Sequence, residues 1–123
     1  MKKNKKKILI LEDEKSLARA LELKFMKEGF DVKILHDGEE VPRVLEKEKF
    51  SLIISDLFMP KLNGFQVLEL AKEIGINIPI VILTNISRAE DEKRAMSLGA
   101  KKFFIKTDVP LSKIISYVNE IIL

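Results

Sequence analysis

Residues 51–64 read SLIISDLFMPKLNG, a mostly apolar run that ends at a single acid and is followed by proline, asparagine and glycine. Such a run, bounded by turn-forming residues, predicts a buried strand that passes into a loop at Asp56. In α/β proteins, ligands bind beyond the carboxyl ends of the central strands. Asp56 is therefore the first candidate for a functional residue.

Short apolar runs alternate with amphipathic patterns on both sides of this stretch. In residues 16–28, Leu17, Ala20, Leu21 and Phe25 recur at the three- and four-residue spacing of a helix, and Gly29 closes it. We expect strands at 7–11, 32–35, 52–55, 78–83 and 102–105, and helices at 16–28, 39–49, 63–75, 87–98 and 108–122. This strict alternation predicts an α/β fold, a doubly wound parallel sheet with helices on both faces and right-handed crossovers.

Two prolines and a serine mark expected ends of these elements. Pro42 lacks a backbone donor, so the helix at 39–49 should begin close to it. Pro79 falls near the start of the strand at 78–83, where a missing donor is tolerated. Ser87 and Glu90 have the spacing of a capping box, in which the two residues satisfy each other's free backbone amides.

Length and composition favour one soluble globular domain. A chain of 123 residues is large enough for one core and too short for two. The absence of cysteine excludes disulfides and thiolate metal sites, and the single histidine, His36, argues against a histidine-based zinc site. The apolar runs are too short to span a membrane, and the lysine-rich start does not resemble a secretory signal. We therefore expect a cytoplasmic protein.

The net charge of +3 is concentrated at the amino terminus. Five lysines lie in residues 2–7, and without them 17 basic residues face 19 acidic ones, a balance of −2. We interpret residues 1–6 as a basic, disordered tail and residues 7–123 as the domain. Contact of the tail with nucleic acid or an anionic partner is the alternative.

Polar side chains follow four of the predicted strands. They are Glu12 with Asp13, Asp56, Thr84 and Lys106. Because the carboxyl ends of parallel strands lie at one edge of the sheet, these side chains can converge there. Acids and hydroxyls after single strands are often only caps or turn residues. Four strand ends that carry complementary groups point instead to a shared site.

The chemistry that fits this set is formation of an acyl phosphate. Three carboxylates repel one another, and Mg²⁺ relieves that conflict while leaving room for a phosphate oxygen. Lys106 could neutralise a second phosphate oxygen, and the Thr84 hydroxyl could bind a third. Asp56 would then be the carboxylate nucleophile, since phosphoryl transfer needs mainly positioning and charge neutralisation.

With these motifs the chain resembles the receiver domain of two-component response regulators over residues 7–122. The matching motifs are Glu12-Asp13, Asp56-Leu57-Phe58-Met59-Pro60 through Gly64, Thr84 and Lys106. The resemblance implies a flavodoxin-like (βα)5 fold with strand order 2-1-3-4-5. It also implies Mg²⁺ held by Glu12 or Asp13, by Asp56 and by the Phe58 backbone carbonyl.

The resemblance further implies how the protein would signal. A sensor histidine kinase or a phosphotransfer protein would donate the phosphoryl group, and Thr84 and Phe103 would move together as the switch. The protein would not be an enzyme but a phosphoacceptor that assists its own phosphoryl transfer and dephosphorylation. We expect no attached DNA-binding domain, so output would use residues 88–98, 101–104 and 111–117, toward an unknown protein target or a phosphorylation-dependent homodimer.

The chain departs from the family pattern at two places, Thr107 and Asn85. Thr107 stands where the family usually has a cis proline, and because a cis bond before a non-proline residue costs about 2.5–4 kcal/mol, we predict a trans bond with Lys106 still reaching Asp56. Asn85 follows Thr84 where a small residue is common, which narrows access to the site. Phe58 and Ile86 would flank the path along which water attacks the phosphoryl group. Both side chains are apolar and cannot orient that water, which predicts slow self-dephosphorylation.

Three other functions are alternatives to this one. A flavodoxin-like nucleotide or FMN carrier needs a glycine- or hydroxyl-rich phosphate loop after the first strand, where this chain has Glu12-Asp13-Glu14. A phosphatase of the haloacid dehalogenase type needs a second aspartate two residues after the nucleophile, where this chain has Phe58. The third is a receiver-like binding module that acts without phosphorylation, for which Thr107 and Asn85 leave room.

Overall fold

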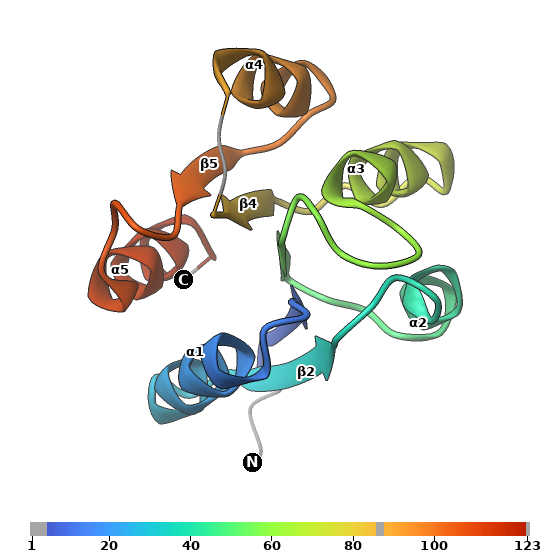
Figure 1. The fold of residues 1–123 in the computed structure, drawn as a ribbon. Coiled ribbons are helices and arrows are strands. Elements are labelled where there is room, and N and C mark those ends of the chain that lie inside the picture. Colours follow the sequence, from blue (N-terminus) through green and yellow to red (C-terminus); the bar gives the residue numbers. More distant parts are fainter. Residues whose placement is uncertain (1–4, 86–87, 123) are drawn as a thin grey trace.

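A five-stranded parallel sheet forms the centre of the structure. The computed structural model describes residues 5–85 and 88–122. The strands are β1 (Lys7–Leu11), β2 (Asp31–Leu35), β3 (Leu52–Ser55), β4 (Ile80–Thr84) and β5 (Lys102–Ile105). They pair in parallel in the order β2-β1-β3-β4-β5 (Figure 1). The predicted flavodoxin-like topology is confirmed.

The helices of the described residues cover both faces of this sheet. They are α1 (Lys15–Lys27), α2 (Val41–Lys47), α3 (Gly64–Glu73), α4 (Ala89–Ser97) and α5 (Leu111–Ile122). α1 and α5 lie on one face, and α2, α3 and α4 lie on the other (Figure 1). The chain passes from each strand to the next through a helix. The carboxyl ends of all five strands therefore lie at the same edge of the sheet.

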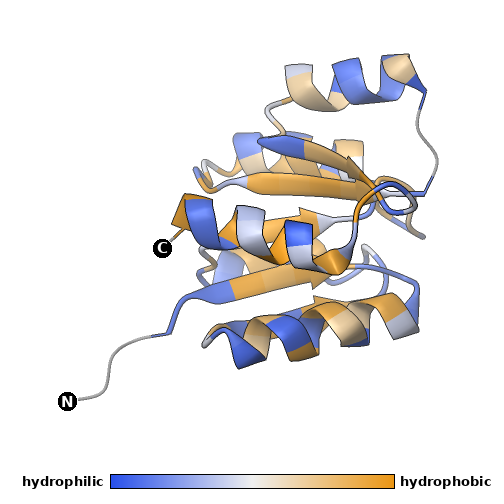
Figure 2. Cartoon of the chain, turned by 90° about the vertical axis from the view of Figure 1, so that its left-hand side faces the viewer, coloured by the Kyte–Doolittle hydropathy of each residue, from blue (hydrophilic) through white to orange (hydrophobic). Residues whose placement is uncertain are grey.

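Each face of the sheet has its own apolar core. Successive strand residues point to opposite faces, so Ile53 packs among the side chains of α2, α3 and α4, and Ile54 among those of α1 and α5. Both isoleucines are buried. Figure 2 shows the apolar strands between helices that carry hydrophilic residues along their length. Burial on both faces explains why the strands read as continuous apolar runs rather than as alternating patterns.

Several predicted ends of helices are confirmed. Gly29 follows α1 with φ +96°, a left-handed conformation that glycine adopts without a Cβ clash. Pro42 is the second residue of α2, where its missing donor costs nothing. Asn63 caps α3 in a reciprocal pair with Gln66, each side chain accepting a backbone N–H at 2.9 Å.

Other boundaries differ from the prediction. β4 begins at Ile80, so Pro79 precedes the strand instead of lying within it. Ser87 lies outside the described residues, and the N-cap of α4 is Arg88, whose backbone N–H is 3.4 Å from the Asp91 carboxylate. The capping partner predicted at Glu90 is therefore wrong, because the helix begins one residue later and the third helical position moves to Asp91.

The predicted tail at residues 1–6 falls mostly outside the described residues, so the division at residue 7 stays a prediction. Lys6 joins the domain through its backbone, since its carbonyl accepts the Asp31 N–H at 2.9 Å, and its ammonium group contacts the Ile122 carbonyl. Within residues 5–85 and 88–122, every helix is too short or too polar to cross a membrane.

Candidate functional site

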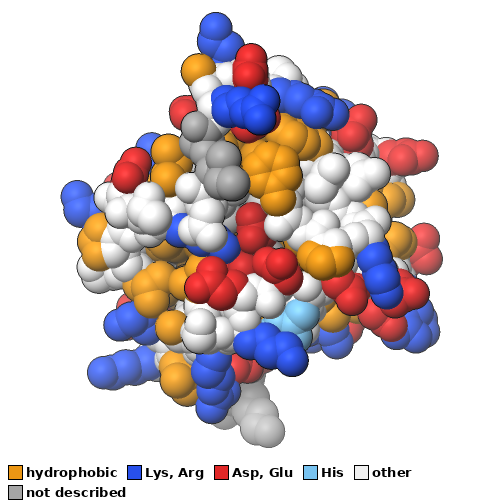
Figure 3. Space-filling view, viewed as in Figure 1, with side chains coloured by type: hydrophobic (Ala, Val, Ile, Leu, Met, Phe, Trp, Pro, Cys, Tyr) orange, Lys and Arg blue, Asp and Glu red, His pale blue; other side chains and the backbone are white. Residues whose placement is uncertain are grey.

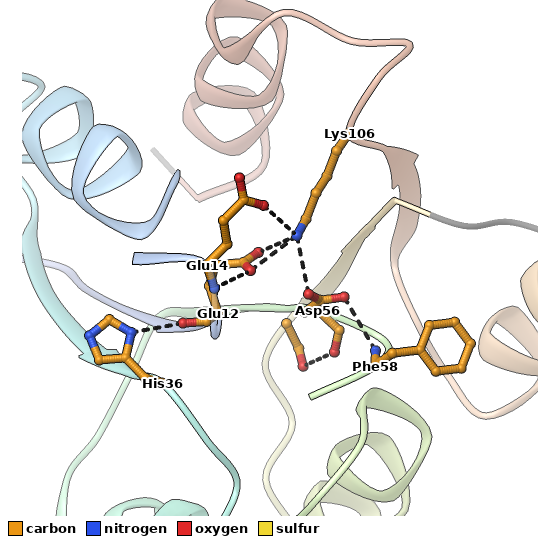
Figure 4. A network of polar contacts seen from close by, with 7 residues as sticks. Glu12, Glu14, His36, Asp56, Phe58 and Lys106 are labelled. Atoms are coloured by element: carbon orange, nitrogen blue, oxygen red, sulfur yellow. Dashed lines mark hydrogen bonds and ion pairs between the residues drawn. The ribbon is translucent and has the colours of Figure 1, made fainter. Parts of the chain in front are cut away.

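Three charged side chains meet where β1, β3 and β5 end. The Lys106 Nζ lies 2.8 Å and 3.0 Å from the two Glu12 carboxylate oxygens and 3.1 Å from the Asp56 Oδ2. Figure 4 shows the lysine reaching between the two acids. These residues are far apart in the sequence, and the parallel sheet alone brings them together.

The sheet also fixes the backbone of all three residues. The strand pairing continues one residue beyond the strand ends: Glu12 N–H donates to Leu35 at 3.0 Å, Asp56 N–H to Leu11 at 2.8 Å, and Lys106 N–H to Thr84 at 2.8 Å. Because the backbone is held in this way, each side chain can change position only by changing its rotamer. The site is therefore preorganised by the same hydrogen bonds that build the sheet.

Burial changes the protonation of Glu12. Glu12 is 2% exposed, and this burial raises the pKa of its carboxyl group from 4.5 to about 7. Hydrogen bonds from Lys106 and from the Glu14 N–H, 3.0 Å away, oppose the increase, and the negative charge of Asp56 adds to it. Burial lowers the pKa of Lys106, but its contacts with Glu12 and Asp56 outweigh that effect and raise the pKa above its usual value. Lys106 is therefore a fixed positive charge among the acids.

The loop after Asp56 is shaped around its carboxylate. The Phe58 N–H donates to Asp56 Oδ1 at 3.2 Å, and the Gly64 N–H donates to the Leu57 carbonyl at 2.8 Å. A Cβ at Gly64 would lie 2.8 Å from the Asp56 carbonyl oxygen and 2.9 Å from the Leu57 Cα, closer than real Cβ contacts allow. Glycine at position 64 thus lets the first turn of α3 pack directly on the strand end.

The acids fit a divalent cation. Glu12, Asp13 and Asp56 each offer one carboxylate oxygen, and these oxygens lie within 4.8 Å of one another. Asp13 is exposed, whereas Glu12 and Asp56 are buried, so an ion at this point would keep several waters, as Mg²⁺ prefers. A ligand role for the Phe58 carbonyl stays a prediction.

A cavity of about 310 Å³ opens beside these residues. It is lined by Asp13, Glu14, Asp56, Phe58, Thr84, Asn85 and Lys106. Figure 3 shows acidic side chains gathered near the middle of this face of the molecule. The cavity is large enough for a phosphoryl group and its ligands. Asn85 lines it, and the predicted narrowing of access stays a prediction.

The two predicted switch residues occupy different positions relative to the cavity. Thr84 ends β4, is buried and lines the cavity. Phe103 is partly buried on β5 and packs against the core that contains Ala95 of α4. The structure thus places Thr84 at the site and Phe103 on β5, against the core that α4 helps to cover.

The peptide bond between Lys106 and Thr107 is trans. No described residue has a cis bond, and Lys106 still contacts Asp56. Both parts of the prediction for this departure from the family pattern are confirmed. The Lys106 N–H donates to the Thr84 carbonyl, so the end of β5 stays in register with β4 although Thr107 replaces the usual proline.

Two further residues contact the charged cluster, defined here as Glu12, Asp56 and Lys106 with their backbone atoms, and were not predicted from the sequence. Glu14 places a carboxylate oxygen 3.6 Å from Lys106 Nζ. His36 Nδ1 lies 2.9 Å from the Glu12 backbone carbonyl. The strand order could have found His36, because β2 lies next to β1 and the residue after one strand then lies beside the residue after the other. No sequence pattern distinguished Glu14 from an exposed helix-start acid.

Comparison with known proteins agrees with this geometry. The family profile described as "Response regulator receiver domain" matches residues 8–119. The chain is 39% identical over 107 residues to the probable transcriptional regulator ycf27 of Porphyridium aerugineum, covering 86% of this chain and 44% of that protein. It is 34% identical over 105 residues to the alkaline phosphatase synthesis transcriptional regulatory protein PhoP of Bacillus subtilis (strain 168), covering 85% and 44%.

The solved structures agree as well. The receiver domain of the Francisella response regulator 1452 superimposes with a TM-score of 0.86 at 26% identity, covering 94% of both chains. The chain spans just under half the length of the two curated relatives named above. The chain belongs to the response regulator receiver domain family.

Proposed function

We propose that the protein is a response regulator that accepts a phosphoryl group on Asp56. The observation that carries this proposal is the buried contact of Asp56 with Lys106, beside the acid pair of Glu12 and Asp13, in a member of the receiver family. A sensor histidine kinase or phosphotransfer protein of the cytoplasm would be the donor. The protein would remain a phosphoacceptor, assisting its own phosphoryl transfer, and not an enzyme that acts on other substrates.

The transfer needs little covalent chemistry from the protein. An Asp56 carboxylate oxygen attacks the phosphorus of a phosphohistidine, a P–O bond forms, the P–N bond breaks, and the departing imidazole takes up a proton. Glu12, Asp13, Asp56 and the Phe58 carbonyl would hold Mg²⁺, which would neutralise charge on the phosphoryl oxygens. Lys106 would bind a second oxygen and the Thr84 hydroxyl a third.

The output would pass from Thr84 to the face formed by α4, β5 and α5. In α4 the buried residue is Ala95, so this helix is held to the sheet by little apolar area. Phe103 packs against the same core and pairs with Ile82, two residues before Thr84 on β4, so movement of Thr84 would change the space available to it. A modest change in contact free energy at this point can shift the population of two arrangements of α4. That face would bind the downstream protein target or a second phosphorylated copy.

Acetyl phosphate with Mg²⁺ tests the proposal directly. We expect intact-mass measurement to show an added phosphoryl group on the wild-type chain and none on Asp56→Asn. Asp108→Asn, which changes an exposed aspartate after β5, should take up the group like the wild type. An unmodified wild-type chain with acetyl phosphate and with a phosphohistidine donor would contradict the proposal and favour the phosphorylation-independent binding module.

The decay of the acyl phosphate should depend on Phe58. This side chain is 48% exposed and lines the cavity, where it can offer no hydrogen bond to an attacking water. We expect Phe58→Asn to speed the decay about tenfold, equivalent to about 1.4 kcal/mol of transition-state stabilisation. Phe58→Leu, which is also apolar, should decay like the wild type. An unchanged rate in Phe58→Asn would remove this explanation; Ile86, the other predicted flanking residue, lies outside the described residues.

A further inference from the structure

We propose that the turn between β2 and α2 positions the phosphoacceptor loop, with Gly38 as the positioning residue. The phosphoacceptor loop is defined here as residues 57–63, between Asp56 and α3. This inference rests on the proposed function, because the purpose of the loop is to present Phe58 to the site. Gly38 itself touches neither the charged cluster nor the cavity, and it acts through Leu62.

The first evidence is a close approach of two backbones. A Cβ built on Gly38 would lie 2.0 Å from the Leu62 Cβ, 2.5 Å from its nitrogen and 2.6 Å from its Cα. Two of these three atoms are backbone, so rotation of the Leu62 side chain could not relieve the clash. The Gly38 N–H also donates to the Pro60 carbonyl at 2.9 Å. Any larger residue at position 38 must therefore push the loop away from the turn.

The second evidence is a strained conformation at the same place. Lys61 has φ +71° and is the one described non-glycine residue with positive φ. The Leu62 N–H donates to the Pro60 carbonyl at 2.9 Å across it, which is the hydrogen bond of a γ-turn, and the positive-φ form of that turn is rare and strained. Such strain persists only where surrounding contacts impose it. The contact that imposes it here is the close backbone approach of Gly38, and the Glu39 carboxylate adds an exposed ion pair 2.9 Å from Lys61 Nζ.

The third evidence is that both ends of this arrangement reach the charged cluster. The phosphoacceptor loop is held at Leu57 by Gly64, and between that point and the γ-turn lies Phe58, whose N–H donates to the Asp56 carboxylate. On the other side, His36 of the same turn contacts the Glu12 carbonyl at 2.9 Å. The β2–α2 turn thus contacts the backbone of Glu12 directly and, on the other side, the loop that follows Asp56.

Displacing the loop should therefore weaken the site more than the fold. In Gly38→Ala we expect about tenfold weaker Mg²⁺ binding, the loss typical of altered support for metal ligands. Val118→Ala, on α5, is the control, because Val118 is fully buried in the core of the opposite face. It should lower thermal stability while leaving the Mg²⁺ affinity within about twofold of the wild type, since distant sites act independently.

The experiment measures the Mg²⁺ affinity of the three chains by calorimetry and by the rise in Tm with Mg²⁺ concentration. Hydrogen exchange at the Phe58 amide gives a readout without metal: it should be faster in Gly38→Ala than in Val118→Ala after correction for global stability. Leu62→Gly removes the Cβ, which is the Leu62 atom nearest to Gly38. It loosens the same contact more mildly and should weaken Mg²⁺ binding by about threefold if Gly38→Ala does not fold.

Wild-type Mg²⁺ affinity and Phe58 exchange in the folded Gly38→Ala chain, or in Leu62→Gly in its place, would overturn the inference. Failure of the proposed function has a different signature. In that case the wild-type chain takes no phosphoryl group from any donor, while Phe58 exchange still separates Gly38→Ala from Val118→Ala.

Discussion

Lys106→Met should destabilise the metal-free protein by about 3–5 kcal/mol at pH 8, the usual loss when one partner of a buried ion pair is removed. Lys106 contacts Glu12 and Asp56, which are 2% and 6% exposed, so methionine would leave two carboxylates buried side by side without a cation. Urea unfolding in the presence of a chelator measures the change. The loss should be smaller at pH 5, where Glu12 carries a proton in the wild type as well.

Lys101→Met is the matched control for this variant. Lys101 is exposed just before β5, and surface charges of this kind contribute little to stability. Mg²⁺ should recover part of the stability lost in Lys106→Met, because it supplies positive charge to the same acids. Equal unfolding free energies for Lys106→Met and the wild type at pH 8 would mean that the two acids are not ionised together in the folded protein.

Glu12→Gln should change how stability depends on pH. In the metal-free wild type the folded state holds the Glu12 proton more tightly than the unfolded state, since its pKa rises from 4.5 to about 7. This contribution is therefore fully present below pH 4.5 and is lost as pH rises through about 7. The free energy of unfolding should fall by about 3 kcal/mol over that interval, at 1.36 kcal/mol for each unit of pKa difference.

In Glu12→Gln that decline should be absent, because an amide does not ionise, and the variant should be more stable than the wild type at pH 8 in chelator. Chemical denaturation at a series of pH values gives the two profiles. Glu90→Gln, at an exposed position on α4, should keep the wild-type decline. A Glu12→Gln profile that fell in parallel with the wild type would assign the titration to another group.

Both variants test the same property of the site, an excess of negative charge that the fold tolerates through cations. Lys106 is built into the chain and is always present. The second cation, a metal, would come from solution and would compete with the proton on Glu12. Removing the lysine therefore destabilises the metal-free fold, whereas removing the charge of Glu12 stabilises it, and the opposite signs separate the two roles.

The local sequence determined the elements and the residues at their ends. Apolar runs such as the one before Asp56 predicted the strands, three- and four-residue spacing predicted α1, and Gly29 and Pro42 marked helix ends, because these signals depend on neighbours within one or two turns. The strict alternation of strand and helix then required a parallel sheet. A parallel sheet brings its carboxyl ends to one edge, so the convergence of Glu12, Asp56 and Lys106 could be predicted as well.

Tertiary structure decided the contacts that join distant loops. The contact of His36 with Glu12 and the close approach of Gly38 to Leu62 depend on how two separate segments meet in space. The left-handed conformation of Lys61 has the same origin, since nothing in its neighbours favours positive φ and only packing against the β2–α2 turn imposes it. The raised pKa of Glu12 likewise comes from burial by the whole fold, because an isolated glutamate after a strand would remain solvated.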